Sequence, residues 1–395
     1  MRLAIEGGVP VRSTLLPYGR QQLDEADIEA VVQVLQGDWL TTGPRVAEFE
    51  QAAADFVGVE TAVAVNSGTA ALHAAMYALG IGPGDEVIVP TLTFAATANC
   101  VVFQGGTPVF ADVEPETLLL DPAQVEAKIT PRTRAVIAVD YAGQPCDYEA
   151  LRAITDKYGL ALVDDACHAI GGSYKGRPVG SLADLNTFSF HPVKHITTGE
   201  GGMITTSDPD LAQRMRIFRN HGITSDHRQR TEQGSWFYEM VDLGYNYRIT
   251  DFQCALGLSQ LRKLPGWVAR RQEIAGCYNE AFAELSELHP LTVQPEVSHA
   301  YHLYVVRLDL SRLRVGRAEV FAALRAENIG VNVHYIPVHL HPFYREHFHT
   351  GPGLCPVAEA AYEQILSLPI FPGMQKTDIE AVIAAVFKIC QAYRG

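Results

Sequence analysis

Residues 62–89 read AVAVNSGTAALHAAMYALGIGPGDEVIV, in which two apolar runs of strand length flank a helical run. The spacing predicts strands over Ala62–Val65 and Glu86–Val89, with a helix over Gly68–Leu79 between them. Two strands joined through a helix pair in parallel, and a parallel sheet is buried on both faces. This stretch therefore predicts an α/β architecture.

The same alternation continues on both sides of this stretch. Helical patterns precede it, and further strand-length runs follow it. Such a pattern favours a mostly parallel central sheet with helices on both faces, and ligands bind such sheets at the carboxyl ends of the strands. The further predicted helices are 24–36, 46–57 and 147–158, and the further predicted strands are 108–111, 135–139 and 160–163.

The alternation of predicted strands and helices changes after about Leu264. We interpret the remainder as a smaller α/β domain. The chain would then consist of a large domain over residues 20–264 and a small C-terminal domain over 265–395, with residues 1–19 packing near the small one. The elements expected after the boundary are a long helix over 267–285, a strand over 303–308, a helix over 317–327, a strand over 331–334 and two further helices.

The composition is that of a globular protein. Of 395 residues, 47% are apolar and 19% are charged, which excludes general disorder, collagen-like repeats and a small disulfide-rich fold. Lysine and arginine number 31 against 45 acidic residues, which gives a net charge of −14. An acidic chain does not suit non-specific nucleic-acid binding, because that binding depends on neutralising phosphates.

The sequence predicts neither export nor a membrane span. The N-terminus, MRLAIEGGVPVRST, lacks the apolar segment of a secretory signal, and the longest uncharged stretch, residues 87–111, is interrupted by Pro90 and Pro108. Seven widely spaced cysteines without a CxxC pair indicate free thiols in a reducing compartment. We therefore expect a cytoplasmic protein.

The first of three chemical motifs is Asn66-Ser67-Gly68-Thr69, which lies between an apolar strand and the start of a helix. Free backbone N–H groups and the helix dipole favour an anion there, and the two hydroxyl groups add donors. A plain helix cap would explain the same residues. The GxxxxGK[ST] pattern of another phosphate-binding loop is absent.

The second motif is LALVDDACH, residues 160–168, in which an apolar strand leads into Asp164, Asp165 and then His168. Side chains alternate along a strand, so the two acids point in opposite directions and one of them can face a ligand. One exposed acid and one capping acid would be the plain alternative. A metal site would lack a third ligand nearby.

The third motif is NTFSFHPVKHITTGEGGMITT, residues 186–206, in which an apolar strand leads through Ser189 to Lys194 and a glycine-rich turn. A lysine between apolar segments is costly unless its charge is used or removed. A Schiff base with an aldehyde cofactor removes the ammonium, whereas the alternative is a lysine that extends to the surface. Together, a phosphate-binding turn, a carboxylate and this lysine are what pyridoxal 5′-phosphate requires.

The order and spacing of these motifs resemble those of the nucleotide-sugar aminotransferases. The resemblance runs from GDWLTTGPRVAEFE (37–50) to VNVHYIPVHLHPFY (331–344) and includes LGYNYRITDFQCALGLSQL (243–261). It implies the aspartate-aminotransferase fold (fold type I), pyridoxal 5′-phosphate as cofactor, and a homodimer with shared active sites. A branch of the family with histidine in place of the lysine catalyses dehydration, so Lys194 implies transamination.

For the cofactor, the resemblance implies a role for each matching residue. Lys194 would form the Schiff base and move the proton, Asp165 would pair with the pyridine nitrogen, and His168 would lie against one face of the ring. Phe94 would pack on the other face. The residues expected to hold the phosphate are Gly68, Thr69 and Ser189 of one chain and Asn246 of the partner chain.

For the substrate, the chain most resembles the pseudaminic-acid branch of the family. This implies transfer of an amino group from L-glutamate to C4 of UDP-2-acetamido-2,6-dideoxy-β-L-arabino-hex-4-ulose. The alternative is a 4-aminotransferase for another nucleotide-linked 4-keto sugar, of the aminoarabinose or bacillosamine type. The residues that match segments lining the sugar-nucleotide site are Tyr18, Trp39, Leu40, Thr41, Val331, Asn332, Val333 and His334.

Two functions of other classes are compatible with the sequence. Histidines at positions 334, 339, 341, 347 and 349 could form a metal-binding module. They lack placed carboxylates and a helical spacing, so we predict no metal site. The second alternative is a pyridoxal-phosphate protein without turnover.

Overall fold

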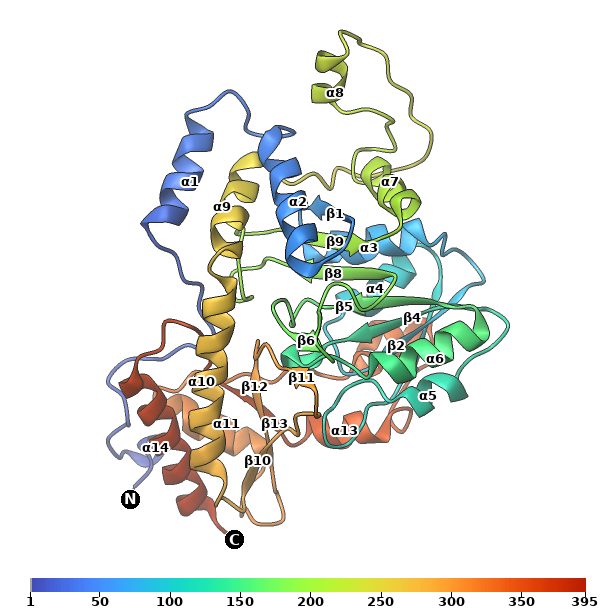
Figure 1. Ribbon diagram of the computed structural model, residues 1–395. Coiled ribbons are helices and arrows are strands. Elements are labelled where there is room, and N and C mark those ends of the chain that lie inside the picture. Colours follow the sequence, from blue (N-terminus) through green and yellow to red (C-terminus); the bar gives the residue numbers. More distant parts are fainter. Residues whose placement is uncertain (1) are drawn as a thin grey trace.

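The central element of the fold is a seven-stranded sheet (Figure 1), and the structure, a computed structural model, describes residues 2–395. The strand order is β1-β9-β8-β5-β4-β2-β3. Neighbouring strands pair in parallel except for β9, which runs antiparallel to both β1 and β8. The predicted mostly parallel sheet is therefore confirmed. Its strands are β1 Thr61–Val65, β2 Glu86–Pro90, β3 Thr107–Ala111, β4 Thr133–Val139, β5 Ala161–Asp165, β8 Leu185–Ser189 and β9 Gly202–Thr206.

Helices cover both faces of this sheet. Helix α3 packs against α4 and α7 on one face, and α5 and α6 pack together on the other (Figure 1). Strand β2 is buried along its whole length, as two covered faces require. The helices of this part are α1 Glu25–Leu35, α2 Pro44–Val57, α3 Gly68–Ala78, α4 Ala96–Phe103, α5 Pro122–Ala127, α6 Tyr148–Tyr158, α7 Pro209–Phe218, α8 His227–Glu232 and α9 Asp251–Leu261.

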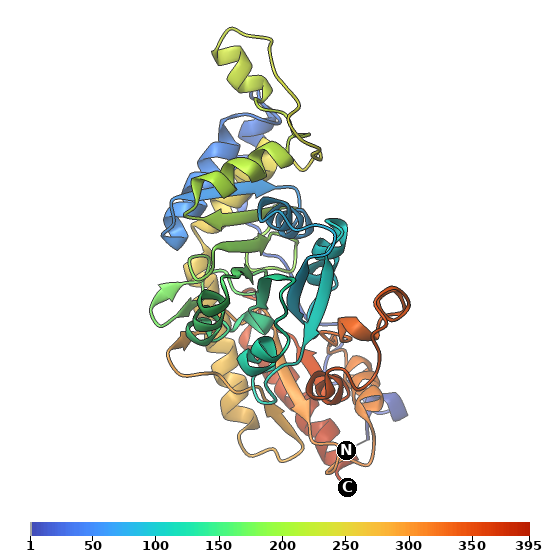
Figure 2. The same ribbon diagram turned by 90° about the vertical axis from the view of Figure 1, so that its right-hand side faces the viewer.

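A second apolar cluster forms around a small antiparallel sheet of order β10-β12-β13. Helix α10 runs from the large sheet to the small one (Figure 1) and contributes Val268 to the first cluster and Tyr278 to the second. The N-terminal residues Leu3 and Leu16 also pack into the second cluster, so both termini lie at one end of the molecule (Figure 2). The elements of this part are α10 Leu264–Phe282, β10 Leu288–Pro290, β12 Tyr304–Leu308, α11 Arg317–Ala326, α12 Pro342–His347, α13 Pro356–Tyr362, β13 Ile365–Leu368 and α14 Lys376–Tyr393.

The C-terminal part differs from the sequence prediction in three respects. Residues 331–334 are not a strand: only Asn332 pairs, in an isolated bridge with Ser367, because the chain leaves the sheet there to line a cavity. Three α-helices, a short 3-10 helix over Val338–Leu340 and the strand β13 follow them, where two helices were expected. The long helix begins at Leu264, because Pro265 fits the first turn of a helix and does not interrupt it.

The N-terminal segment is held by one buried carboxylate. Glu327, which follows α11, is fully buried and accepts hydrogen bonds from the backbone N–H groups of Ala4 and Val11, both at 2.9 Å. It also forms an ion pair with Lys388 of α14, with 2.7 Å between Nζ and Oε1. A single charge thus joins the start of the chain to two C-terminal helices.

We expect Glu327→Ala to lower the free energy of unfolding by about 3–5 kcal/mol, because it leaves Lys388 buried without its partner. Burial raises the pKa of Glu327, but the bonds from Lys388 and the two backbone groups outweigh it, so the pKa lies below its usual value. The stabilisation is therefore present at neutral pH and is lost as the pH falls through the lowered pKa. Urea unfolding at neutral and acidic pH measures both effects.

The matched control is Glu363→Ala, which removes an exposed carboxylate. It should change the free energy of unfolding by no more than about 0.5 kcal/mol. Equal losses in the two variants would contradict the assignment.

Candidate active site

A cavity of about 560 Å³ lies at the carboxyl ends of β5 and β8 and brings the three motifs together. Ligands are expected at this edge of a parallel sheet. The predicted site residues of these motifs all line it: Gly68, Thr69, Asp165, His168, Ser189 and Lys194. The other predicted site residues that line it are Tyr18, Phe94, Asn332, Val333 and His334.

The first motif forms the start of α3. Ser67 is the N-cap, and its Oγ accepts a hydrogen bond from the N–H of Ala70 at 3.1 Å. The N–H groups of Gly68 and Thr69 belong to the first turn, where a helix offers them no partner. A Cβ on Gly68 would lie 2.8 Å from the Cβ of Ser189, so the turn and Ser189 form a cradle too tight for a side chain. The cap and the anion site are thus compatible.

The two acids of the second motif occupy different environments. Asp165 lines the cavity, and its Oδ2 accepts a hydrogen bond from Thr97 Oγ1 at 2.7 Å. Asp164 is fully buried, and neither carboxyl oxygen has a hydrogen-bond partner within residues 2–395. Burial and the neighbouring charge of Asp140 raise the pKa of Asp164 well above its usual value. Asp165 is therefore the acid that faces the cavity.

Lys194 lies in the turn that follows β8, where its backbone N–H donates to the carbonyl of His191 at 2.9 Å. Its side chain lines the cavity and does not run along the outer surface. Burial lowers the pKa of Lys194, although the nearby Cys167 and Asp165 oppose this. A lowered pKa leaves more of the amine neutral, which is the form that attacks an aldehyde.

His168 is held between two rings that the sequence analysis did not single out. Its Nε2 lies 3.0 Å from the hydroxyl of Tyr335, and the ring centroid of His302 lies 4.4 Å from its own. Both Tyr335 and His302 line the cavity. Burial and the charge of Lys194 lower the pKa of both histidines well below the usual value, so both rings are neutral. The one available signal for His302 was its position directly before the strand predicted over 303–308.

Five predicted site residues do not line this cavity. Val331 is buried in the second apolar cluster instead. The other four lie elsewhere. The backbone at Thr41 bridges Thr250, and the Leu40 carbonyl accepts from the N–H of Asp251 at 3.0 Å. Asn246 lies beside the first motif, since its carbonyl accepts a hydrogen bond from Asn66 Nδ2 at 3.3 Å. These four are Trp39, Leu40, Thr41 and Asn246, and all but Trp39 are exposed.

The histidines of the alternative metal module do not form a metal-binding cluster. His334 lies 2.8 Å from Ser367 Oγ through its Nδ1, while His339 contacts Thr91 and Glu359. Across the described chain, no group of three or more His, Cys, Asp or Glu side chains is arranged to hold a metal ion. Within the same residues, no helix is both long enough and apolar enough to cross a bilayer.

The chain belongs to the DegT/DnrJ/EryC1/StrS aminotransferase family, whose family model matches residues 21–387. It is 45% identical over 380 residues to the spore coat polysaccharide biosynthesis protein SpsC of Bacillus subtilis, with 96% of this chain and 98% of SpsC covered. The fold is that of the aspartate-aminotransferase-like sugar aminotransferases. The chain is thus a pyridoxal-phosphate-dependent sugar aminotransferase.

Solved structures agree with this assignment. The PLP-form of Spr1654 from Streptococcus pneumoniae superposes with a TM-score of 0.90 at 32% identity, covering 96% of this chain and 99% of that one. Helicobacter pylori PseC, an aminotransferase involved in the biosynthesis of pseudoaminic acid, also gives a TM-score of 0.90 at 32% identity, covering 96% of this chain and 100% of PseC.

The cavity fits pyridoxal 5′-phosphate on its own geometry. Gly68 and Thr69 line it at the start of α3, where backbone N–H groups have no helical partner and favour an anion. Phe94 lines the cavity with 60% of its surface exposed, which leaves an aromatic face for a ring to cover. Asp165 offers a carboxylate, and Lys194 an amine of lowered pKa.

We expect Asp165→Asn to keep the cofactor bound and to lower kcat by about 10²–10³-fold, because the pyridine nitrogen loses its charged partner. Asp164→Asn should stay close to wild type, because Asp164 does not line the cavity. Steady-state kinetics and the visible absorption of the bound cofactor measure both. If Asp164→Asn lost most of its kcat while Asp165→Asn stayed nearly normal, Asp164 and not Asp165 would be the acid that pairs with the pyridine nitrogen.

Proposed function

We propose that the protein transfers an amino group from L-glutamate to C4 of UDP-2-acetamido-2,6-dideoxy-β-L-arabino-hex-4-ulose, for pseudaminic acid biosynthesis. The observation that carries the proposal is the convergence of Lys194, Asp165 and the Gly68 cradle in one cavity, in a chain that matches PseC over its whole length. The second candidate is another nucleotide-linked 4-keto sugar. The higher identity to SpsC, a polysaccharide biosynthesis protein, favours that candidate.

The chain's own residues would prepare the cofactor. When bound, pyridoxal 5′-phosphate supplies an aldehyde that accepts the amino group and a ring that withdraws electrons. The N–H groups of Gly68 and Thr69 and the hydroxyl of Ser189 would hold its phosphate, since helix N-termini favour anions. Asp165 would keep the pyridine nitrogen protonated, with Phe94 and His168 against the two ring faces.

Lys194 would transfer the proton during transamination. It is the one lysine or arginine that lines the cavity in the described chain. Because burial lowers its pKa, it can take a proton from the donor carbon and return it to the acceptor carbon. Tyr18, Asn332 and His334 would hydrogen-bond the sugar, with Val333 against its apolar edge.

We also propose a homodimer in which each site draws residues from both chains. Around Asn246 the chain exposes large apolar side chains, including Trp236 at 84%, Leu243 at 68% and Met240 at 64%. Exposed apolar surface of this kind marks an interface. Since residues 39–41 are joined to 250–251 by backbone contacts, Trp39, Leu40 and Thr41 would enter the same partner site as Asn246.

Purified enzyme supplied with the UDP-linked 4-keto sugar and L-glutamate should yield the 4-amino sugar, which NMR of the product identifies. Borohydride reduction and peptide mapping should place the cofactor on Lys194, and Lys194→Ala should abolish turnover. A panel of UDP- and dTDP-linked 4-keto sugars decides between the two candidates. If glutamate leaves the cofactor absorption unchanged and no sugar reacts, the protein lacks turnover and the proposal is wrong.

Mixing Lys194→Ala chains with Asn246→Asp chains tests the shared sites. After random subunit exchange, half of the dimers are mixed and carry one intact site each, so about a quarter of wild-type activity should return. The Asp carboxylate would repel the phosphate, so each parent alone should be nearly inactive. Activity no higher than that of the parents, with exchange confirmed, would exclude the cross-subunit role of Asn246; the local alternative, a helix cap, does not apply either, because Thr250 caps α9.

A further inference from the structure

The outer edge of β1 is held by side chains where the sheet ends. This strand lies at one edge of the central sheet and, among the described strands, pairs with β9 alone. An edge strand turns the backbone groups of every second residue away from its neighbour and leaves them without a ladder partner. In β1 these residues are Ala62 and Ala64, and both are buried. Buried backbone groups need hydrogen-bond partners, and here side chains from other elements supply them.

Ala64 is held by Glu50 and Arg219. Its N–H donates to Glu50 Oε1 at 2.9 Å, and its carbonyl accepts from Arg219 Nη1 at 2.5 Å. The two side chains also form an ion pair with each other, so the three residues close a ring of hydrogen bonds. Ala64 thus receives one acceptor and one donor, as it would from the residue opposite it in a neighbouring strand.

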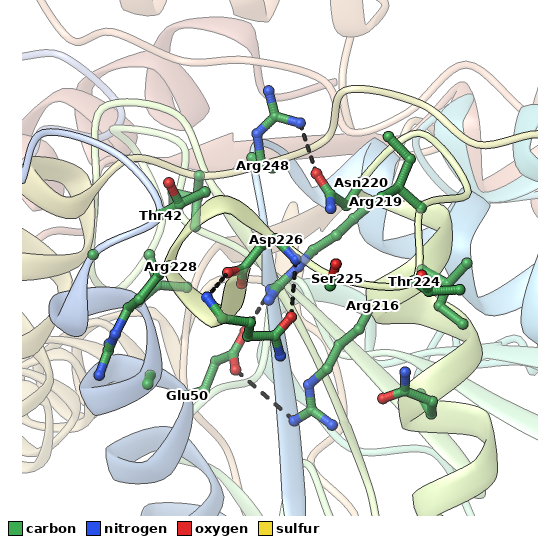
Figure 3. A pocket seen from close by; sticks show the side chains of 18 of the residues that line it. Thr42, Glu50, Arg216, Arg219, Asn220, Thr224, Ser225, Asp226, Arg228 and Arg248 are labelled. Carbon is green, nitrogen blue, oxygen red and sulfur yellow. Dashed lines mark hydrogen bonds and ion pairs between the residues drawn. The ribbon is translucent and has the colours of Figure 1, made fainter. Parts of the chain in front are cut away.

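This ion pair lies largely out of the solvent. The side chain of Glu50, on α2, is 11% exposed, and that of Arg219, directly after α7, is 15% exposed, so water screens the pair less than it screens a surface pair. Arg216 of α7 donates to the Ala62 carbonyl at 3.2 Å and lies 3.9 Å from Glu50 Oε2, so both arginines point toward this carboxylate (Figure 3). One carboxylate thus joins α2 and α7 to the edge strand.

A second connection reaches the residue at which the phosphate-binding turn begins. The N–H of Asn66 donates to the Tyr247 carbonyl at 2.9 Å, and the N–H of Tyr247 donates to the Arg219 carbonyl at 3.0 Å. Arg219 therefore acts on the end of β1 twice, through its side chain at Ala64 and through its backbone toward Asn66. On the inner side, the turn packs so closely on β9 that a Cβ on Gly202 would lie 2.3 Å from the carbonyl oxygen of Ser67. The turn is thus fixed from both sides.

We propose that Glu50 and Arg219 are positioning residues for the phosphate of the cofactor. Neither lines the active-site cavity. They fix Ala64 and, through it, the backbone N–H groups of Gly68 and Thr69 that follow in the same turn. Hydrogen bonds weaken steeply with misalignment, so a displaced turn would loosen the hold on the phosphate and leave the rest of the cofactor site intact. This inference rests on the proposed role of the Gly68 cradle in holding the phosphate.

Titration of the full-length apoenzyme with pyridoxal 5′-phosphate, and with pyridoxal, which lacks the phosphate, tests the proposal. Both aldehydes can react with Lys194, so visible absorption reports their binding without turnover. Glu50→Ala removes the acceptor of Ala64 and the partner of Arg219, so it should weaken pyridoxal 5′-phosphate by about tenfold. The affinity for pyridoxal should stay unchanged. Glu50→Gln restores the acceptor for Ala64 and should recover part of the lost affinity.

Two control variants accompany this titration. Glu48→Ala is the matched control, because Glu48 is an exposed glutamate of the same helix that pairs with Arg45 at the surface, and both affinities should stay as in wild type. Ser189→Ala removes a proposed phosphate donor from the cradle itself. It should weaken pyridoxal 5′-phosphate and leave pyridoxal unaffected.

Equal losses for the two aldehydes in Glu50→Ala, or no loss for either, would overturn the proposal, because an ion pair that only stabilises the fold does not distinguish them. If Glu50→Ala does not fold, Glu50→Gln and Arg219→Lys decide the question, and each must lose affinity for pyridoxal 5′-phosphate alone. A selective loss in Ser189→Ala without one in the Glu50 and Arg219 variants rejects this inference and keeps the cradle. No selective loss in any of these variants rejects the cradle as the phosphate site as well.

Discussion

The close approach of the turn after β1 to the end of β8 is the constraint on which the site depends. Strand β9 lies antiparallel between them, and its Gly202 is in register with both Val65 and Ser189. A Cβ on Gly202 would lie 2.3 Å from the carbonyl oxygen of Ser67, and one on Gly68 would lie 2.8 Å from the Cβ of Ser189. Two residues without side chains thus allow this cradle to close, and Lys194 follows from the strand that forms one wall of it.

The electrostatics of the cavity follow from burial. His195 and His302 lie behind the lysine with ring centroids 5.7 Å apart, and the lowered pKa of each leaves it neutral. Asp164 does not line the cavity, and burial and the neighbouring charge of Asp140 raise its pKa. The acidic and basic side chains, other than histidines, that line the cavity are Asp165, Glu200 and Lys194.

The parts of the site that local patterns encode could be predicted from the sequence. The cradle at Gly68, the choice of Asp165 over Asp164 and the position of Lys194 each rest on a strand with a chemical residue at its end. Contributions from distant segments could not be predicted this way. His302 contacts His168 only because two distant segments of the chain pack together. The hydrophobic pattern of neither segment indicates this contact. The extended segment at 331–334 was mistaken for a strand, since lining a cavity and pairing in a sheet demand the same backbone and similar residues.

Helix α10 has a consequence for anyone who would exchange sugar specificity between relatives. Asn332, Val333 and His334 come from beyond this helix, so grafting the C-terminal segment of another enzyme is an obvious route to a hybrid. A crossover at residue 264 would install a foreign helix whose first turns must fit the apolar cluster of the large sheet, where Val268 is packed. Productive chimeras therefore need their junction beyond these first turns, with the native side chains of the helix start retained.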